Sequence, residues 1–208
     1  REVYLIDEPM AAAIGAGLPI EVPMGHMVVD IGGGTTEVAV ISMGGLVVFN
    51  SIRTAGDKFD EAIVSYLRKA YNVYIGERTA ERVKINIGCA MKLESTIEMD
   101  VKRSDITTGL PRTIKVTSDE MVVALEEPVT KIIEGIKLTL EQTKPELAAD
   151  IIDKGIVLTG GGSQLKSFDL KLSNETGVPV HLAENPQDCV VLGAGKMLEE
   201  QMDVLRRL

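Results

Sequence analysis

The stretch Val28-Val29-Asp30-Ile31-Gly32-Gly33-Gly34-Thr35-Thr36-Glu37-Val38-Ala39-Val40 joins two apolar runs through three glycines and two threonines. Consecutive glycines let the backbone approach an anion closely and turn its N–H groups toward phosphate oxygens. An acidic residue directly before such a turn, here Asp30, can hold a hydrated Mg²⁺ or orient water. Taken alone, the stretch is equally compatible with an ordinary β-hairpin whose glycines only supply positive φ angles.

A second group of three glycines follows another apolar run, in Ile156-Val157-Leu158-Thr159-Gly160-Gly161-Gly162-Ser163. A helix is predicted from about Gln164, and a helix N-terminus beside glycines admits a phosphate or a flat base. The segment is neither a Walker A loop nor a GxGxxG dinucleotide fingerprint. Close packing of a strand against a helix is the alternative explanation, so this loop also leaves two interpretations open.

The composition describes a folded chain with an acidic balance. Its 208 residues, 45% of them hydrophobic, can bury a sizeable core in one domain or two small lobes. The net charge of −9 argues against nucleic acid as a partner, because neutralising nucleic-acid phosphates requires clustered Lys and Arg. A local phosphate site stays compatible with this charge, since backbone N–H groups bind anions without side-chain charge.

The cysteines and the chain start bear on the cellular setting. Cys89 and Cys189 lie far apart, predict neither a disulfide framework nor a metal site, and fit a reducing cytoplasm. No apolar run approaches the roughly 20 residues that span a bilayer. The chain opens without Met at Arg1-Glu2-Val3-Tyr4-Leu5-Ile6, in what is predicted to be the middle of a strand, so we expect a fragment.

The first half of the chain alternates between short strands and helices. Glycine turns separate three β-rich runs that predict an antiparallel meander, at 27–31, 37–41 and 46–50. Apolar residues at helical spacing predict a helix that follows Asp57 as its N-cap, and a second helix over 77–87. Two polar β-rich runs, 96–102 and 111–116, predict a small peripheral sheet with a turn around 104–109.

The second half begins with a helix signal. Thr117 and Glu120 have the spacing of a capping box, which opens a helical tract to about Gln142. Because Pro128 lacks an N–H, it should break or kink this tract, and two consecutive helices are predicted. The remaining predicted elements are a helix over 146–152, a strand over 155–159, the helix from 164, a strand over 178–182 and a helix from 188 to the C-terminus.

Together the two glycine loops resemble the second phosphate motif and the adenosine motif of the actin, Hsp70 and sugar-kinase superfamily. Within that superfamily, the amino-acid sequence is most similar to the MreB family of bacterial actins, and this similarity covers essentially the whole chain. The most similar segments are Leu5-Ile6-Asp7-Glu8-Pro9-Met10-Ala11-Ala12-Ala13-Ile14-Gly15, residues 27–41, Ala55-Gly56-Asp57, residues 76–84 and Pro145-Glu146-Leu147. The resemblance implies an α/β, actin-like (ribonuclease H-like) fold that binds ATP with Mg²⁺.

The resemblance also implies a role for each matching residue. Glu8 would position the water that attacks the γ-phosphate, and Asp30 would assist through Mg²⁺ or water. Asp57 would lie near the phosphate or metal side of the cleft, and Glu81 and Lys84 would contact ribose and adenine. The residues implied to cradle the β- and γ-phosphates are Gly32, Gly33, Gly34 and Thr35. Those implied to complete the adenosine pocket are Gly160, Gly161, Gly162 and Ser163.

Each of these side chains has a plain structural alternative. Glu8 could be a carboxylate that favours a helix start, and Asp57 could be an N-cap. Glu81 and Lys84, three residues apart, could form a solvated pair on one helix surface. Without the resemblance, the structural alternatives are preferred for Glu8, Glu81 and Lys84; the resemblance reverses that preference.

The resemblance implies how the chain is divided. Residues 1–17 would end a first subdomain, 18–56 with 128–185 would form the nucleotide-binding core, 57–127 an inserted small subdomain, and 186–208 a C-terminal helix. Actin-like proteins close on nucleotide between two halves, and the first half carries its own Asp-x-Gly-Thr phosphate loop. No such loop precedes Glu8. We therefore expect the chain alone to bind ATP weakly and hydrolyse it negligibly.

By resemblance, the function is that of an ATP-dependent polymer subunit with slow hydrolysis. Its filaments would assemble head-to-tail in the bacterial cytoplasm, lie beneath the inner membrane, organise cell-wall synthesis with inner-membrane cell-shape proteins and maintain rod shape. Contact with the membrane would use the missing first half. The rival is a soluble phosphotransferase or a chaperone-type ATPase on the same fold, which fold analogy alone does not separate. The C-terminal helix disfavours the chaperone, which would continue into a β-rich domain, and to a smaller extent the phosphotransferase. A catalytically inactive scaffold fragment stays open as a third interpretation of the chain.

Overall fold

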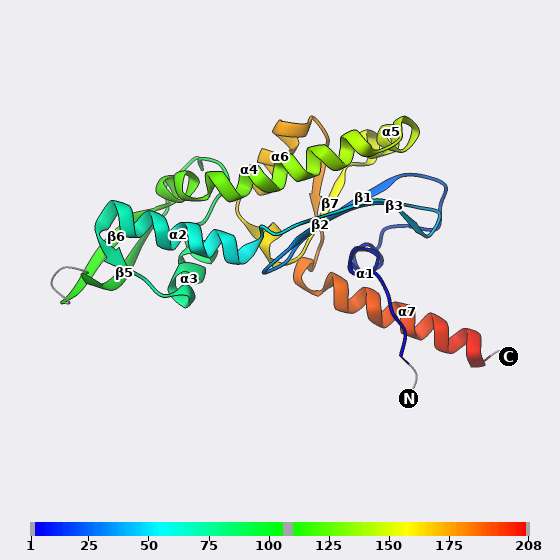
Figure 1. Cartoon of the computed structure of the whole chain (residues 1–208), viewed down its shortest axis with the longest axis horizontal. Coiled ribbons are helices and arrows are strands. Elements are labelled where there is room, and N and C mark those ends of the chain that lie inside the picture. The colour runs from blue at the N-terminus through cyan, green and yellow to red at the C-terminus, as the bar shows by residue number, and fades with distance from the viewer. Residues whose placement is uncertain (1–2, 106–109, 207–208) are drawn as a thin grey trace.

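A five-stranded sheet forms the centre of the computed structural model, which describes residues 3–105 and 110–206 (Figure 1). The strand order is β3-β2-β1-β7-β8. The strands are β1 (His26–Ile31), β2 (Thr36–Ser42), β3 (Gly45–Ile52), β7 (Ile156–Thr159) and β8 (Val180–Leu182). The predicted antiparallel meander of β1, β2 and β3 is confirmed.

The pairing of β1 places both glycine loops at one end of the sheet. β7 runs parallel to β1, with Thr159 opposite Asp30. Because parallel neighbours end at the same edge, the loop after Ile31 and the loop after Thr159 leave the sheet side by side. This edge, at the carboxyl ends of two adjacent strands, is a usual place for ligand sites in α/β folds.

Helices cover both faces of the sheet (Figure 1). Along β1, Val29 and Ile31 point into the larger core cluster, and Val28 points into a smaller cluster on the opposite face. The smaller cluster is closed by α1 (Glu8–Gly15), which packs against α7 (Cys189–Arg206). The larger cluster lies under α4 (Ser118–Gln142), α5 (Pro145–Lys154) and α6 (Phe168–Thr176).

The backbones of α1 and α7 are in direct contact. A methyl group added to Gly15 would lie 1.7 Å from the carbonyl oxygen of Cys189, and one added to Gly193 would lie 1.8 Å from that of Ala11. No side chain fits at either position, so glycine permits the crossing. The two helices are thereby held at a fixed relative position.

A smaller three-stranded sheet lies away from the central one (Figure 1). Its strand order is β4-β5-β6, with β4 (Val73–Tyr74), β5 (Glu98–Asp105) and β6 (Pro111–Thr117). Two helices accompany this sheet, α2 (Gly56–Tyr71) and α3 (Glu77–Ile87). The predicted peripheral sheet and the helix over 77–87 are confirmed, and β4 is an addition. Of the predicted turn at 104–109, residues 106–109 lie outside the described residues.

The prediction of two helices on either side of Pro128 is wrong, because α4 continues through it as one 25-residue helix. The N-terminal signal is correct: Thr117 and Glu120 form a capping box. A proline inside a helix costs about 3 kcal/mol. Here that cost is offset by packing, since Pro128 itself is buried and the buried residues Leu125, Val129, Ile132 and Ile136 flank it. Burial of each such apolar side chain stabilises the folded state by about 1.5–3 kcal/mol.

Two predicted helix starts are also corrected. The N-cap of α2 is Ala55, and Asp57 lies in the first helical turn. The helix predicted from about Gln164 is a 3₁₀ turn, η1 (Gly161–Gln164), followed by α6 from Phe168. Leu165, whose ψ of 123° is extended, ends the 3₁₀ turn, and Ser167, with a left-handed φ of 59°, directly precedes α6. A second 3₁₀ turn, η2 (Pro186–Asp188), precedes α7.

Candidate functional site

The first glycine loop is tied by its carbonyl groups to the start of α2. The N–H of Gly56 donates to Gly32 O at 3.0 Å, and that of Asp57 donates to Gly33 O at 2.8 Å. In a trans peptide the following N–H points opposite to the carbonyl. The N–H groups of Gly33 and Gly34 therefore point away from α2.

The tip of this loop is open. Gly33, Gly34 and Thr35 are exposed, and a methyl group on Gly34 would meet no atom within 4 Å. Within the described residues, no hydrogen bond engages the N–H of these three residues, whereas Gly32 N donates to Thr35 O at 3.0 Å. Two outward N–H groups on an exposed, glycine-rich turn have the form of an anion-binding nest.

Asp30 is buried at the base of the loop. The residue is 4% exposed, and Thr159 Oγ1 donates to Asp30 Oδ1 at 2.7 Å. Burial raises the pKa of this carboxyl, while the hydrogen bond from Thr159 lowers it. Thr159 directly precedes the second glycine loop, so Asp30 is held between the two loops.

Glu37 is a carboxylate of this region that the sequence analysis missed. It lies opposite Asp30 in the β1–β2 ladder, and its buried Oε2 has no hydrogen-bond partner among the described residues. Its pKa is raised by burial first, and then by the negative charges of Glu8, Asp30 and Asp7. The available signal was symmetry: Asp30 and Glu37 flank the turn, and antiparallel pairing places opposite residues on one face.

Glu8 is the first residue of α1 and is exposed. Because α1 contacts both β1 and β2, and the charge of Glu8 helps to raise the pKa of Glu37, the start of α1 lies near the end of β1 and the start of β2. The structure thus brings Glu8, Asp30 and the first glycine loop to one region, as the sequence-based site requires. No group of three or more His, Cys, Asp or Glu residues in 3–105 and 110–206 could hold a metal ion.

The second glycine loop packs on the end of β1. Gly160 has a φ of +81°, and a methyl group there would lie 2.4 Å from Ile31 O. Gly162 is equally close, at 2.5 Å from Ile31 Cγ2. Ser163 is buried and donates to Gly160 O at 2.6 Å, so its hydroxyl closes the turn. Gly161 is exposed, beside Gln187.

Lys84 reaches back from α3 to α2. Its Nζ lies 2.9 Å from Asp60 Oδ2 and 3.1 Å from Gly56 O. The structural alternative of a surface pair between Glu81 and Lys84 is wrong, since the carboxylate paired with Lys84 is that of Asp60 and Glu81 is exposed. Asp57 lies near the first loop, its Oδ1 3.4 Å from the position of a methyl group on Gly33.

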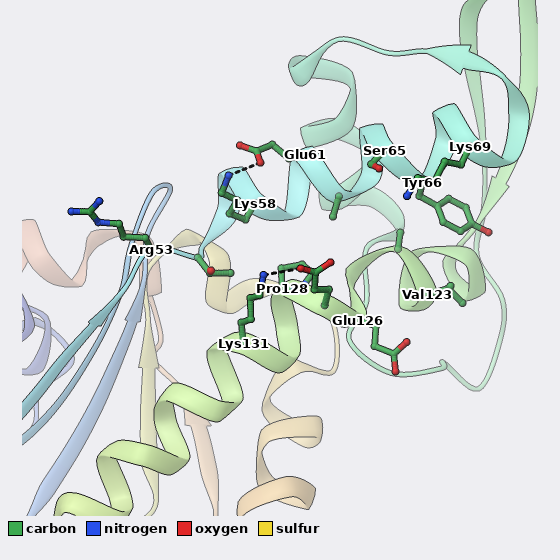
Figure 2. Close-up of a pocket in the computed structure, with 14 residues that line it drawn as sticks. Arg53, Lys58, Glu61, Ser65, Tyr66, Lys69, Val123, Glu126, Pro128 and Lys131 are labelled. Atoms are coloured by element: carbon green, nitrogen blue, oxygen red, sulfur yellow. Dashed lines mark hydrogen bonds and ion pairs between the residues drawn. The ribbon is translucent and has the colours of Figure 1, made fainter.

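Two grooves flank α2. One, of about 540 Å³, runs past Asp57 and Asp60 toward Tyr74. The other, of about 750 Å³, lies between α2 and α4 (Figure 2). Figure 2 shows that its walls carry both signs of charge. On α2, Lys58 pairs with Glu61, and on α4, Lys131 pairs with Glu127. None of the predicted site residues lines this second groove.

The sequence model of one protein family, described as MreB/Mbl protein, matches residues 1–206. The chain belongs to the MreB/Mbl family. This confirms the resemblance drawn from the two glycine loops and from the segment Leu5 to Gly15.

In the described residues, no helix is both long and apolar enough to cross a membrane.

Curated relatives support the same assignment. The cell shape-determining protein MreB of Escherichia coli (strain K12) is 53% identical over 199 residues, which are 96% of this chain and 57% of that protein. The cell shape-determining protein Mbl of Bacillus subtilis (strain 168) is 51% identical over 205 residues, 99% of this chain and 61% of that protein. The chain therefore spans about three-fifths of the length of these MreB/Mbl proteins.

Solved structures confirm the actin-like α/β fold. MreB5 of Spiroplasma citri bound to ADP matches with a TM-score of 0.93 at 40% identity, and the match covers 97% of this chain and 61% of the MreB5 chain. The same protein bound to AMPPNP has a TM-score of 0.93 at 38% identity, covering 98% and 62%. The MamK double helical filament, at 23% identity and a TM-score of 0.75 over 93% of this chain and 58% of its own, shares the fold.

Proposed function

We propose that this chain is the second, nucleotide-holding half of an ATP-dependent, filament-forming bacterial actin that determines cell shape. The observation that carries the proposal is the pair of glycine loops at the ends of β1 and β7, with Asp30 between them. The names of the MreB and Mbl relatives support the cell-shape role. The structures of MreB5 with ADP and AMPPNP support a nucleotide ligand.

The residues of the site fit the phosphates of ATP. The outward N–H groups of Gly33 and Gly34, together with the exposed Thr35, would cradle the β- and γ-phosphates. Glu81 and Lys84 on α3 would contact ribose and adenine, and Asp57 would lie on the phosphate side. In the second loop, Gly161 is the exposed glycine, while Gly160, Gly162 and Ser163 would shape the pocket by packing.

The carboxylates have distinct proposed roles. Glu8, exposed at the start of α1, would orient and deprotonate the attacking water. Asp30 would hold water that belongs to the Mg²⁺ shell, since a magnesium ion commonly keeps several waters and needs few protein carboxylates. This arrangement agrees with the lack of a three-ligand metal cluster in the described part of the chain. Bound Mg²⁺ supplies neutralisation of the phosphate charge.

The division of the site between two halves sets its activity. We propose the subdomain boundaries given by the resemblance, with residues 18–56 and 128–185 as the nucleotide-binding core. The MreB5 structures extend beyond this chain, which matches about 61% of their length. With only one side of the phosphate clamp present, the chain alone would bind ATP weakly and hydrolyse it negligibly. Calorimetry of the chain with Mg²⁺ and ATP measures this directly, and tight binding would contradict it.

The proposed partners follow from the same assignment. Copies of the full-length protein would assemble head-to-tail into filaments in the bacterial cytoplasm, beneath the inner membrane. There they would organise inner-membrane cell-shape and wall-synthesis proteins, with the first half making the membrane contact. The MreB and Mbl names of the relatives reported above favour this role over a soluble phosphotransferase or a chaperone-type ATPase.

Filament formation is the direct test. The full-length protein is incubated with ATP, ADP or no nucleotide, then sedimented and viewed by electron microscopy. ATP-dependent filaments are expected, and Glu8→Gln should slow phosphate release about 100-fold or more while the filaments still form, because a catalytic base contributes this much. Absence of filaments under every nucleotide condition would count against the proposal.

A further inference from the structure

The contact between α3 and α2 is a small, largely buried polar network. The side chains of Lys84 and Asp60 are 17% and 14% exposed, and their charged atoms are 2.9 Å apart. Lys84 Nζ also donates to the carbonyl of Gly56 at 3.1 Å. By contrast, the pair Lys58–Glu61 on the same helix is 50% and 61% exposed. Of the two pairs, only the first couples separate elements.

Gly56 connects this network to the first glycine loop. Its carbonyl accepts from Lys84, and its N–H donates to Gly32 O at 3.0 Å. The next N–H, of Asp57, donates to Gly33 O at 2.8 Å. The backbone at the start of α2 is thus held from both sides, by the ammonium of Lys84 and by the carbonyls of the loop.

Asp60 keeps the ammonium in place. Its Oδ2 pairs with Lys84, while its buried Oδ1 has no hydrogen-bond partner among the described residues. Burial raises the pKa of this carboxyl, and its hydrogen bond and ion pair with Lys84 lower it. The nearby negative charges of Glu81 and Asp57 also raise its pKa. Lys84 is therefore the cation that balances the buried carboxylate.

We propose that Asp60 is a positioning residue for nucleotide binding, which acts through Lys84 and Gly56 to fix the first glycine loop in the form whose N–H groups point outward. The proposal rests on the nucleotide site proposed above. Because Lys84 is also the proposed contact to ribose or adenine, the Asp60–Lys84 pair links the nucleoside side of the site to the phosphate side. Loss of the pair would then weaken binding of the phosphates without removing any group that touches them.

The first experiment needs no nucleotide. Hydrogen exchange at the N–H groups of Gly56 and Asp57 reports the bonds to the loop carbonyls. In Asp60→Asn of the full-length protein, exchange at both positions should be about tenfold faster or more, because the ammonium loses its charged partner. The matched control is Glu61→Gln, the same chemical change one residue later in an exposed pair, which should stay within twofold of the parent protein.

The second experiment measures dissociation constants for fluorescent ATP and for fluorescent adenosine. Asp60→Asn should weaken ATP binding about tenfold, and adenosine binding by a smaller factor, while Glu61→Gln changes neither. A loss of stability alone would lower the melting temperature and leave the affinity of the folded protein unchanged. If the parent protein binds no nucleotide, the proposed function fails, while the exchange result still decides whether Asp60 fixes the loop.

A second variant guards against misfolding of Asp60→Asn. Removing one member of a buried pair is costly, whereas replacing both is often tolerated. The double variant Asp60→Asn with Lys84→Met should therefore fold and show the same fast exchange at Gly56 and Asp57. Exchange at Gly56 and Asp57 within twofold of the parent in whichever of these variants folds would overturn the proposal, and so would an ATP affinity of Asp60→Asn within twofold of the parent.

Discussion

The two glycine loops have nearly the same sequence and opposite environments. Gly32–Thr35 leaves β1 with its N–H groups outward and open space at Gly34. Gly160–Ser163 leaves the neighbouring strand and packs against Ile31, with an internal hydrogen bond from Ser163. In the first loop the glycines leave open space beside outward N–H groups, and in the second they mainly allow one backbone to lie against another. A triglycine after a strand therefore predicts close approach, but not what approaches.

The largest expected effect is at Gly160. Gly160→Ala places a side chain 2.4 Å from Ile31 O at a φ of +81°. Backbone strain of about 1–3 kcal/mol and overpacking of a similar size should together destabilise the protein by about 4 kcal/mol. Urea unfolding measures this loss. A change below 1 kcal/mol would show that the second loop is not packed as described.

Removal of the Ser163 hydroxyl should give the next largest loss of stability. Ser163→Ala removes the donor to Gly160 O and leaves a buried carbonyl without that partner. A loss of about 2 kcal/mol in the free energy of unfolding is expected. Ser163→Thr, which keeps a hydroxyl, is the matched variant. An equal loss in both variants would mean that the hydrogen bond is not the cause.

The first loop should respond in the opposite way. Gly34→Ala meets no atom within 4 Å, so stability should stay within about 0.5 kcal/mol. The added methyl group lies where phosphate would approach, and we expect about tenfold weaker ATP binding by the full-length protein, equal to about 1.4 kcal/mol. Unfolding curves and ATP titrations on the same sample separate the two effects. Normal ATP affinity would indicate that this loop does not contact phosphate.

Asp30 between the loops gives the smallest predicted change, with a definite pH dependence. Asp30→Asn keeps an oxygen for the Thr159 hydroxyl and removes a buried charge, so it should stabilise the protein by about 1 kcal/mol at neutral pH. Burial raises the pKa of Asp30 in the folded state, so the parent protein gains stability as the pH falls toward the ordinary value of 3.8. The advantage of the variant should therefore shrink on acidification. An advantage that grows as the pH falls would contradict this cause.

Local patterns predicted most of the elements, and errors arose where distant packing decides. The meander, the capping box of α4 and the helix over 77–87 each depend on neighbouring residues, and each is confirmed. The continuation of α4 through Pro128 depends on burial against other elements, which the local pattern does not contain. The helix predicted from Gln164 is likewise interrupted by an extended Leu165 and a left-handed Ser167, two residue types that give little local signal for such a break.

The same limit applies to the candidate site. The glycines and Asp30 were found because they are close in sequence and carry a recognisable pattern. Glu37 was missed because its position beside Asp30 depends on strand pairing across the turn. The contact of Lys84 with Asp60 joins residues 24 positions apart on two helices, so spacing alone favoured Glu81 as the partner.

The crossing of α1 and α7 has a mechanical consequence. Because glycines at Gly15 and Gly193 leave the two backbones in contact, one helix cannot slide or roll without displacing the other. Glu8 is at the free end of α1, and the turn before α7 supplies Pro186 O, which accepts from Gly160 N at 2.7 Å. The two helices, in close backbone contact, therefore connect the proposed water-positioning carboxylate to the second glycine loop. We expect a displacement at either end to be felt at the other, because the close backbone contact leaves no room for the helices to move independently.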